Sequence, residues 1–204
     1  MTKTPGLLII ISGPSGVGKG EVCNALKTLD KNIVTSVSVT TREKRPNEIE
    51  GLNYFFKTVK QYEALKKSGS FLETFKIYGN YYGTPKEFVL NKIALGYDVI
   101  LEIDIQGALH VMKNFEGAVS IFLAPPSKEV LEQRLRGRNT EDEITITRRL
   151  SASKEELATV KKYDYIVVNN DISDSAKAIL NIIKSEKFKT LRNKELIKEL
   201  TEGN

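Results

Sequence analysis

Nine residues near the start of the chain, GPSGVGKGE at positions 13–21, have the composition of a loop that binds phosphate. They follow the apolar run LLIIIS and match the spacing G-x-x-x-x-G-K. Glycines let successive backbone N–H groups approach an anion, and the lysine reaches the terminal phosphates of a nucleotide. The alternative is an ordinary turn between a strand and a helix. Because strand, spacing, lysine and helix agree, we expect a nucleoside triphosphate here. The expected lining residues are Gly13, Pro14, Ser15, Gly16, Val17, Gly18, Lys19 and Gly20.

Gly20 departs from the motif, which ordinarily places Ser or Thr after the lysine. The missing hydroxyl removes one direct protein ligand to Mg²⁺. Magnesium keeps several waters and can be held mainly by nucleotide phosphates. We therefore expect no direct protein ligand to the metal, and a Mg²⁺ ion anchored by phosphates and waters.

Arginine residues form two internal groups that offer further contacts with phosphate. Arg42 and Arg45 lie in a turn-rich segment and are followed by Tyr54. Two guanidinium groups and a phenol can converge on one phosphate. Arg134 and Arg149 flank a charged segment that begins GRNTEDE. The other interpretations are a solvated basic loop and salt bridges on exposed helices, and the residues alone leave both open.

The composition fits one folded domain of 204 residues, with 40% hydrophobic and 28% charged residues. No apolar run approaches the roughly 20 residues that span a bilayer. The single cysteine, Cys23, excludes an internal disulfide and favours the reducing cytoplasm. A net charge of +5 is compatible with nucleic acid, but clustered arginines favour small polyanions. We expect neither a membrane nor a nucleic-acid partner.

Short apolar runs alternate with helical patterns along most of the chain. The alternation predicts an α/β fold: a three-layer parallel sheet with helices on both faces. Two inserts are expected over the ends of the strands, where ligands bind in such folds. Strands are predicted at 7–12, 35–39, 97–103, 119–123 and 165–168, and helices at 19–29, 106–114, 127–136 and 173–187. Within the first insert, strands are predicted at 54–56 and 71–75 and a helix at 59–67.

The phosphate loop and five further motifs resemble the guanylate kinase family, in family order and spacing over residues 6–187. The motifs are TTREKRPNEIEG at 40–51, GNYYGTP at 79–85, LEIDIQG at 101–107, IFLAPPS at 121–127 and RLRGRNTEDE at 134–143. The resemblance implies a phosphate-loop kinase that transfers the γ-phosphoryl of ATP to GMP and depends on Mg²⁺. It divides the single domain into a core, a GMP-binding insert, a lid and a helical tail. The core is 1–39, 86–125 and 150–190, the GMP-binding insert 40–85, the lid 126–149 and the tail 190–204.

The resemblance also implies roles for individual residues. The GMP phosphate would be held by Arg42, Arg45, Tyr54 and Tyr82, and the guanine by Ser38, Glu73, Thr84 and Asp104. The chemistry agrees, since carboxylates accept hydrogen bonds from the N1–H and 2-amino groups of guanine, and adenine lacks both donors on that edge. Without the resemblance, Glu73 is an exposed residue of an alternating strand.

On the ATP side, the resemblance implies lid arginines at Arg134, Arg138 and Arg149 and an adenine-bordering residue at Asn169. Lys19 and Arg42 complete the catalytic candidates. A general base is dispensable, because the acceptor phosphate has a second pKa near 6 and is mostly dianionic at neutral pH. The chain departs from the family at Glu21, where a small hydroxyl residue is common, and at Glu102, where Asp is usual.

Two alternatives come from other functional classes. A catalytically inactive guanylate-kinase-like module that binds peptides disagrees with the intact phosphate loop. A kinase for a different nucleoside monophosphate disagrees with the carboxyl pair Glu73 and Asp104. The sequence leaves open whether the chain is a monomer or a homo-oligomer, and whether dGMP is accepted.

Overall fold

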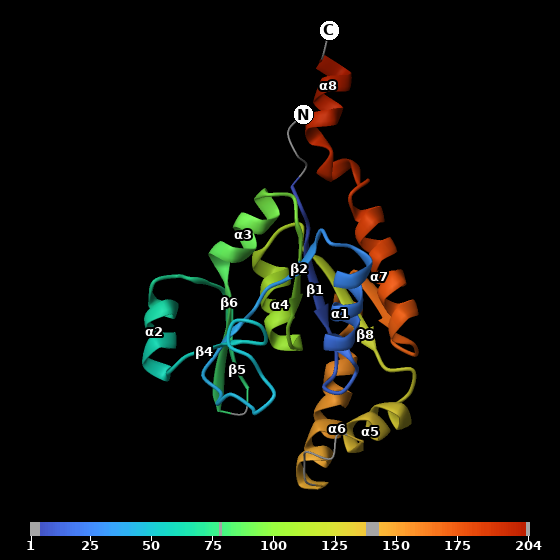
Figure 1. Cartoon of the computed structure of the whole chain (residues 1–204). Coiled ribbons are helices and arrows are strands. Elements are labelled where there is room, and N and C mark those ends of the chain that lie inside the picture. Colours follow the sequence, from blue (N-terminus) through green and yellow to red (C-terminus); the bar gives the residue numbers. More distant parts are fainter. Residues whose placement is uncertain (1–4, 78, 138–142, 203–204) are drawn as a thin grey trace.

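The computed structural model describes residues 5–77, 79–137 and 143–202. Its core is a five-stranded sheet in the order β2-β7-β1-β8-β9 (Figure 1). Each neighbouring pair of strands is parallel, as the alternation of strands and helices predicts. The strands are β1 (Leu8–Ser12), β2 (Ile33–Thr35), β7 (Asp98–Glu102), β8 (Val119–Ala124) and β9 (Tyr165–Val168).

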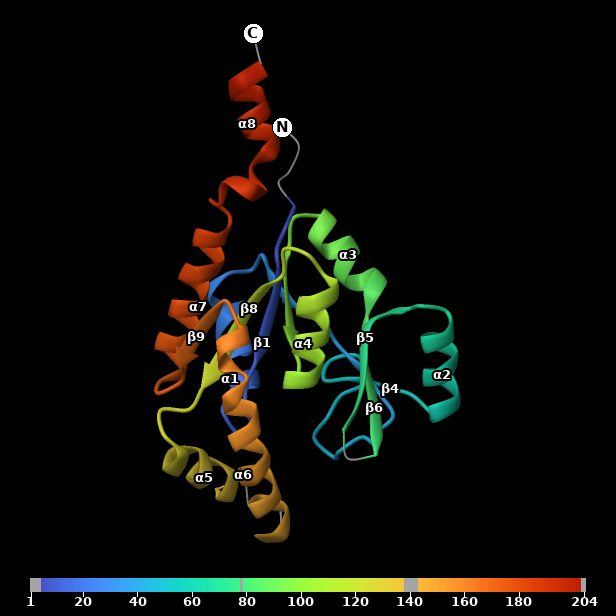
Figure 2. The same cartoon turned by 180° about the vertical axis from the view of Figure 1, so that it is seen from behind.

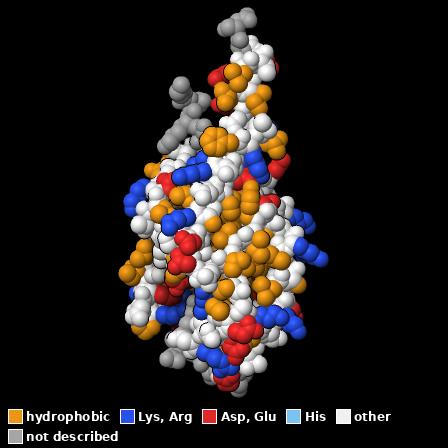
Figure 3. Space-filling view, turned by 90° about the vertical axis from the view of Figure 1, so that its right-hand side faces the viewer, with side chains coloured by type: hydrophobic (Ala, Val, Ile, Leu, Met, Phe, Trp, Pro, Cys, Tyr) orange, Lys and Arg blue, Asp and Glu red, His pale blue; other side chains and the backbone are white. Residues whose placement is uncertain are grey.

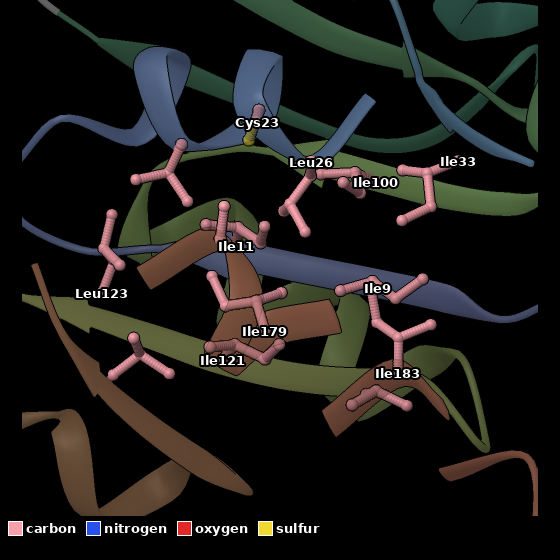
Figure 4. Close-up of a cluster of buried hydrophobic side chains, with 14 of the residues drawn as sticks. Ile9, Ile11, Cys23, Leu26, Ile33, Ile100, Ile121, Leu123, Ile179 and Ile183 are labelled. Atoms are coloured by element: carbon pink, nitrogen blue, oxygen red, sulfur yellow. The ribbon is translucent and has the colours of Figure 1, made fainter. Parts of the chain in front are cut away.

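Successive side chains of the central strand, β1, point to opposite faces of this sheet. Ile9 and Ile11 pack with α1 (Lys19–Leu29) and α7 (Ile172–Glu186), where Cys23 is also buried (Figure 4). Leu8 and Ile10 pack on the opposite face with α3 (Lys86–Ala94) and α4 (Ile105–Asn114). An apolar run without polar alternation is typical of a strand buried on both sides. The predicted three layers are confirmed.

A second, mixed sheet of four strands lies beside the core in the order β4-β3-β6-β5. Its strands are β3 (Val39–Thr40), β4 (Phe55–Phe56), β5 (Phe71–Ile77) and β6 (Asn80–Pro85). Helix α2 (Val59–Lys67) has the predicted bounds, and a capping box at Thr58 and Gln61 fixes its start. The strand predicted at 35–39 is wrong, because β2 ends at Thr35 and the chain crosses to the second sheet before β3.

Two helices, α5 (Lys128–Arg136) and α6 (Glu143–Ala158), project beyond the carboxyl end of the core strands (Figures 1 and 2). The charged segment between Arg134 and Arg149 belongs to α6 from Glu143 onward. A 3₁₀ turn, η1 (Val160–Lys162), leads from α6 into β9. Both helices therefore stand next to the end of the sheet where the glycine-rich loop lies.

The C-terminal tail is tied to the opposite end of the sheet by two buried carboxylates. Asp98 accepts hydrogen bonds from the Leu7 amide at 3.0 Å and from Lys187 Nζ at 2.5 Å. Glu186, 1% exposed, contacts Tyr165, Lys189 and Arg192. Beyond this anchor, η2 (Thr190–Arg192) and α8 (Lys194–Glu202) project from the body, and Figure 3 shows hydrophobic side chains along this projection. In the ranges described above, no helix is long and apolar enough to cross a membrane.

Candidate functional site

The glycine-rich loop joins β1 to α1 in a conformation that requires glycine. Gly18, directly before the helix, has φ +99°, in the left-handed region that favours glycine. A side chain at Gly13 would lie 2.2 Å from the carbonyl oxygen of Leu123 on β8. The loop is therefore packed against the end of the sheet and leads directly into the N-terminus of α1, the end of a helix that attracts anions.

Lys19 is folded back over this loop. Its Nζ donates hydrogen bonds to the carbonyl oxygens of Gly13 at 2.7 Å and Pro14 at 3.3 Å. Burial lowers the pKa of the Lys19 ammonium, and the neighbouring carboxylates of Glu102, Glu156 and Asp104 oppose that shift. A cation in this position is available to the phosphates of a nucleotide that the loop binds.

Arg134 and Asn169 lie behind the loop. Asn169 Nδ2 donates to the carbonyl oxygen of Val17 at 2.8 Å, and Arg134 Nη1 donates to the same oxygen at 3.2 Å. Arg134 Nη2 also donates to the carbonyl oxygen of Asn169 at 3.0 Å. Sequence reasoning placed both side chains toward ATP, whereas these contacts direct them at the protein backbone. No local signal could have revealed this, because Asn169 is 152 positions from Val17.

The remaining arginine candidates of this half lie on or near α6. Arg149 Nη1 donates to Ser15 Oγ at 2.6 Å, so α6 touches the loop directly. Arg138 lies outside the described residues. Glu156, further along α6, was not singled out from the sequence. Burial raises the pKa of its carboxyl, and Lys19 lowers it.

A buried carboxylate lies on the facing sheet. Glu73 on β5 is 2% exposed, and its Oε1 accepts a hydrogen bond from Thr84 Oγ1 on β6 at 2.6 Å. Its Oε2 has no hydrogen-bond partner among the residues that the structure describes. Burial raises the pKa of the Glu73 carboxyl to about 7, the Thr84 hydroxyl lowers it and Asp104 raises it further. An unpartnered buried acceptor of this kind is expected where a ligand supplies the missing donor.

Asp104 connects the two halves of the site. It caps α4, because its Oδ1 accepts a hydrogen bond from the Gly107 amide at 2.8 Å. Burial raises the pKa of the Asp104 carboxyl, and the Gly107 amide and Lys19 lower it. Helix α4, which Asp104 caps, contacts both β1 of the core sheet and β5 of the second sheet, so this carboxylate lies where the two sheets meet.

Arg42, Tyr54 and Tyr82 gather at the edge of the second sheet. The guanidinium carbon of Arg42 lies 5.5 Å from the centre of the Tyr54 ring, and the Tyr54 and Tyr82 rings are 6.0 Å apart. Glu48 orients Arg42 through a 2.6 Å ion pair and accepts a 2.8 Å hydrogen bond from the Arg45 amide. The predicted convergence of Arg42 with the phenols is present, while the Arg45 side chain is exposed. Glu48 was missed, although it lies within the TTREKRPNE motif.

Glu102 and Ser38 complete the set of polar residues in this region. Glu102 ends β7, and its Oε1 lies 3.6 Å from the position that a Cβ on Gly20 would occupy. Burial raises the pKa of the Glu102 carboxyl, and Lys19 opposes that shift. Ser38 is half-buried between the two sheets, and its carbonyl oxygen accepts a hydrogen bond from the Phe55 amide.

The site combines a glycine loop, placed between a buried parallel strand and a helix, with a second sheet that carries a buried carboxylate and an arginine. This combination defines a phosphate-loop kinase that acts on a nucleoside monophosphate. Residues 6–186 match the family model described as Guanylate kinase. The chain belongs to the guanylate kinase family, whose members are ATP:GMP phosphotransferases.

Individual relatives agree with this assignment along the whole chain. The guanylate kinase of Caldanaerobacter subterraneus subsp. tengcongensis is 48% identical over 200 residues, covering 98% of this chain and 97% of the relative. The guanylate kinase of Halalkalibacterium halodurans is 47% identical over 202 residues, covering 99% of each. The crystal structure of guanylate kinase from Anaplasma phagocytophilum superimposes with a TM-score of 0.81 at 34% identity, covering 100% of this chain and 99% of that one.

Proposed function

We propose that this chain transfers the γ-phosphoryl group of ATP to GMP, with ATP on the phosphate loop and GMP on the second sheet. The observation that carries the assignment of GMP is the buried Glu73 carboxyl, whose Oε2 has no hydrogen-bond partner among the residues that the structure describes. Guanine offers two adjacent donors, N1–H and the 2-amino group, and adenine offers neither on that edge. Adenine would leave this acceptor buried and unpaired. Because an unpaired buried acceptor is costly, the site should bind AMP much more weakly than GMP.

The guanine contacts follow from the hydrogen bonds already made. Thr84 donates its hydroxyl hydrogen to Glu73 and thereby orients the carboxylate, so Thr84 acts on guanine through Glu73. Asp104 uses Oδ1 to cap α4, and its second oxygen is the one suited to a guanine donor. Ser38 is then the hydroxyl suited to O6 or N7 of the base.

The GMP phosphate is assigned to Arg42, Arg45, Tyr54 and Tyr82. Arg42 is held by Glu48, which limits the conformations of its guanidinium group and reduces the ordering cost of binding. Burial raises the pKa of Tyr54 to about 12, so its phenol stays a neutral hydrogen-bond donor at every physiological pH. The exposed Arg45 would add a second guanidinium group from the rim of the site.

Catalysis would rest on position and charge. Lys19, Arg149 and Arg138 would neutralise the transferring phosphoryl group, whose charge spreads over its equatorial oxygens. The acceptor phosphate needs no general base, because it is already mostly dianionic at neutral pH. Residues 126–149 are the expected lid that excludes water, a competing acceptor.

The donor set fits a magnesium ion held by the nucleotide. Among the described residues, no three His, Cys, Asp or Glu side chains cluster in a way that could hold a metal by themselves. Glu102 lies beside Gly20 and is the carboxylate nearest the position of the missing hydroxyl. Bound with ATP, Mg²⁺ would be held mainly by the nucleotide and by waters and would neutralise part of the phosphate charge. A cytoplasmic location stays a prediction from the single cysteine.

A substrate panel tests the proposal. The purified chain is assayed with ATP and Mg²⁺ against GMP, AMP, UMP and dTMP in turn. GMP is expected to be phosphorylated with a kcat/KM at least about 10⁴ times that for AMP, the ratio reached where a site must hydrogen-bond donors of its substrate. Comparable turnover of AMP would refute the guanine assignment, and turnover of none would favour a non-catalytic binding module.

A further inference from the structure

The peptide unit between Val17 and Gly18 occupies a critical position in the phosphate loop. In a trans peptide the C=O and N–H groups point in opposite directions. If the carbonyl points away from the nucleotide, the Gly18 N–H points toward it. A flip of this one unit would direct a carbonyl oxygen at the phosphates in place of an N–H donor. Gly18 has φ +99°, and glycine is the residue that allows such flips most easily.

Two side chains hold this carbonyl from behind. The Val17 carbonyl oxygen accepts hydrogen bonds from Asn169 Nδ2 at 2.8 Å and from Arg134 Nη1 at 3.2 Å. A carbonyl oxygen has two lone pairs, so these donors satisfy it fully. Asn169 directly follows β9 and Arg134 lies on α5, so both donors come from outside the loop.

The amide of Asn169 is itself fixed in orientation. Asn169 is 2% exposed, and its Oδ1 accepts a hydrogen bond from Ser175 Oγ on α7 at 3.0 Å. Because a carbonyl cannot donate, the Nδ2 end must face Val17 and the Oδ1 end must face Ser175. A side chain at Gly18 would lie 2.6 Å from Asn169 Nδ2. Asn169 is therefore enclosed, with both ends of its amide committed to protein groups.

We propose that Asn169 is a positioning residue for the donor nucleotide, which sets the Val17–Gly18 peptide so that its N–H faces the phosphates. Arg134 shares this task, and Ser175 keeps the asparagine amide in the required orientation. The inference rests on the proposed binding of ATP at the loop. It gives Asn169 a role in binding phosphate, in contrast to a contact between its side chain and the adenine base.

The test uses Asn169→Asp and Asn169→Ala, with Asn24→Asp as the matched control. Asn24 lies exposed on α1, so its replacement adds the same charge without touching Val17. Dissociation constants are measured by calorimetry for ATP, for inorganic tripolyphosphate and for GMP, with Mg²⁺ present and below the unfolding temperature of each variant. Tripolyphosphate has no base, so it separates a phosphate-loop effect from an adenine contact.

Both Asn169 variants are expected to weaken the binding of ATP and of tripolyphosphate by the same factor, at least about tenfold, because the buried Val17 carbonyl loses the closer of its two donors. GMP binding should stay within about twofold of wild type, since its site lies on the other sheet. Asn24→Asp should stay within about twofold for all three ligands. A loss for ATP with tripolyphosphate unchanged would indicate a base contact and overturn the proposal. An equal loss for GMP, or no loss at all, would overturn it too.

Ser175→Ala keeps the test decisive if the Asn169 variants do not fold. It leaves Asn169 in place and removes only the group that orients its amide, so a weaker loss of about threefold is expected for ATP and tripolyphosphate alike. Unchanged binding of both ligands in this variant would contradict the proposal. A wild-type chain that binds tripolyphosphate without phosphorylating GMP would refute the proposed function alone.

Discussion

Replacing Glu73 by Gln while varying the pH tests the guanine site most directly. In the ligand-free protein, burial raises the pKa of Glu73 to about 7, well above its ordinary 4.5. The guanine donors require the ionised carboxylate, so binding must release a proton at lower pH. Each pH unit below the pKa then weakens the binding of GMP about tenfold. A change from about pH 8 to pH 5 therefore weakens GMP binding about 100-fold through this group.

The Gln variant removes this titration and also loses two hydrogen bonds to a charged acceptor. At about pH 8 we expect GMP to bind it about 100-fold more weakly than wild type, equivalent to about 3 kcal/mol. At about pH 5 the wild-type carboxyl is neutral, so the ratio should shrink to a few-fold. The GMP phosphate titrates near pH 6 in both proteins, and its effect cancels in the ratio.

Calorimetric titration with GMP across this pH range measures the ratio, and titration with ATP is expected to be unchanged by the substitution. Glu116→Gln, at an exposed position, is the matched control and should leave the GMP curve unaltered. A ratio that stays constant between pH 5 and pH 8 would refute the assignment of Glu73 to guanine. The folded protein holds the extra proton between about pH 4.5 and 7, so the stability of the ligand-free wild type should decrease as the pH rises through that window.

Three further predictions concern the loop, α6 and the tail. Arg149→Ala should lower kcat by about 10³ or more, whereas Arg148→Ala on the same helix should keep kcat within a few-fold of wild type. Steady-state kinetics that show the same kcat for both variants would contradict the role of Arg149. Gly20→Ser should change the Mg²⁺ dependence of the rate only modestly, because a Cβ there makes an ordinary contact at 3.6 Å from Glu102. A large loss of activity would count against a metal ion that is held mainly by the nucleotide phosphates. Glu186→Gln should lower the free energy of unfolding by about 2 kcal/mol in urea titrations, since its three polar partners lose a charged acceptor, while kcat at 25 °C stays unchanged. An unaltered urea midpoint would show that this buried cluster contributes little.

The parts of the fold that sequence predicts well are those with local signals. Helix α1 begins and ends at the predicted residues, Lys19 and Leu29, because the lysine of the loop marks its start and apolar spacing marks its face. The second sheet was harder to predict. Strand β6 contains Gly83 and Pro85, residues that are depleted in strands. Gly83 is nonetheless required there, because a Cβ would lie 2.8 Å from the ring of Phe71.

The site shows the same division between local and distant information. The agreement of a strand, the glycine spacing, a lysine and a helix predicted the phosphate loop from local sequence. Resemblance to a family supplied Glu73, whose hydrogen-bond partner Thr84 lies eleven positions away. The contacts of Asn169 and Arg134 with Val17 span 152 and 117 positions. Contacts at such separations are set by the packing of whole elements, and no periodicity in one sequence encodes them.

The buried acids at the base of the sheet have a consequence for how the chain matures during synthesis. Asp98 and Glu186 are neutralised by Lys187, Lys189 and Arg192, which are translated after every strand of the core sheet and after α7. Until those residues leave the ribosome, closing the core would bury carboxylates without their cations, which is costly. The nascent polypeptide should therefore complete its core only after these three residues have left the ribosome, and ribosome-bound chains stalled before Lys187 should remain sensitive to protease where released chains resist it.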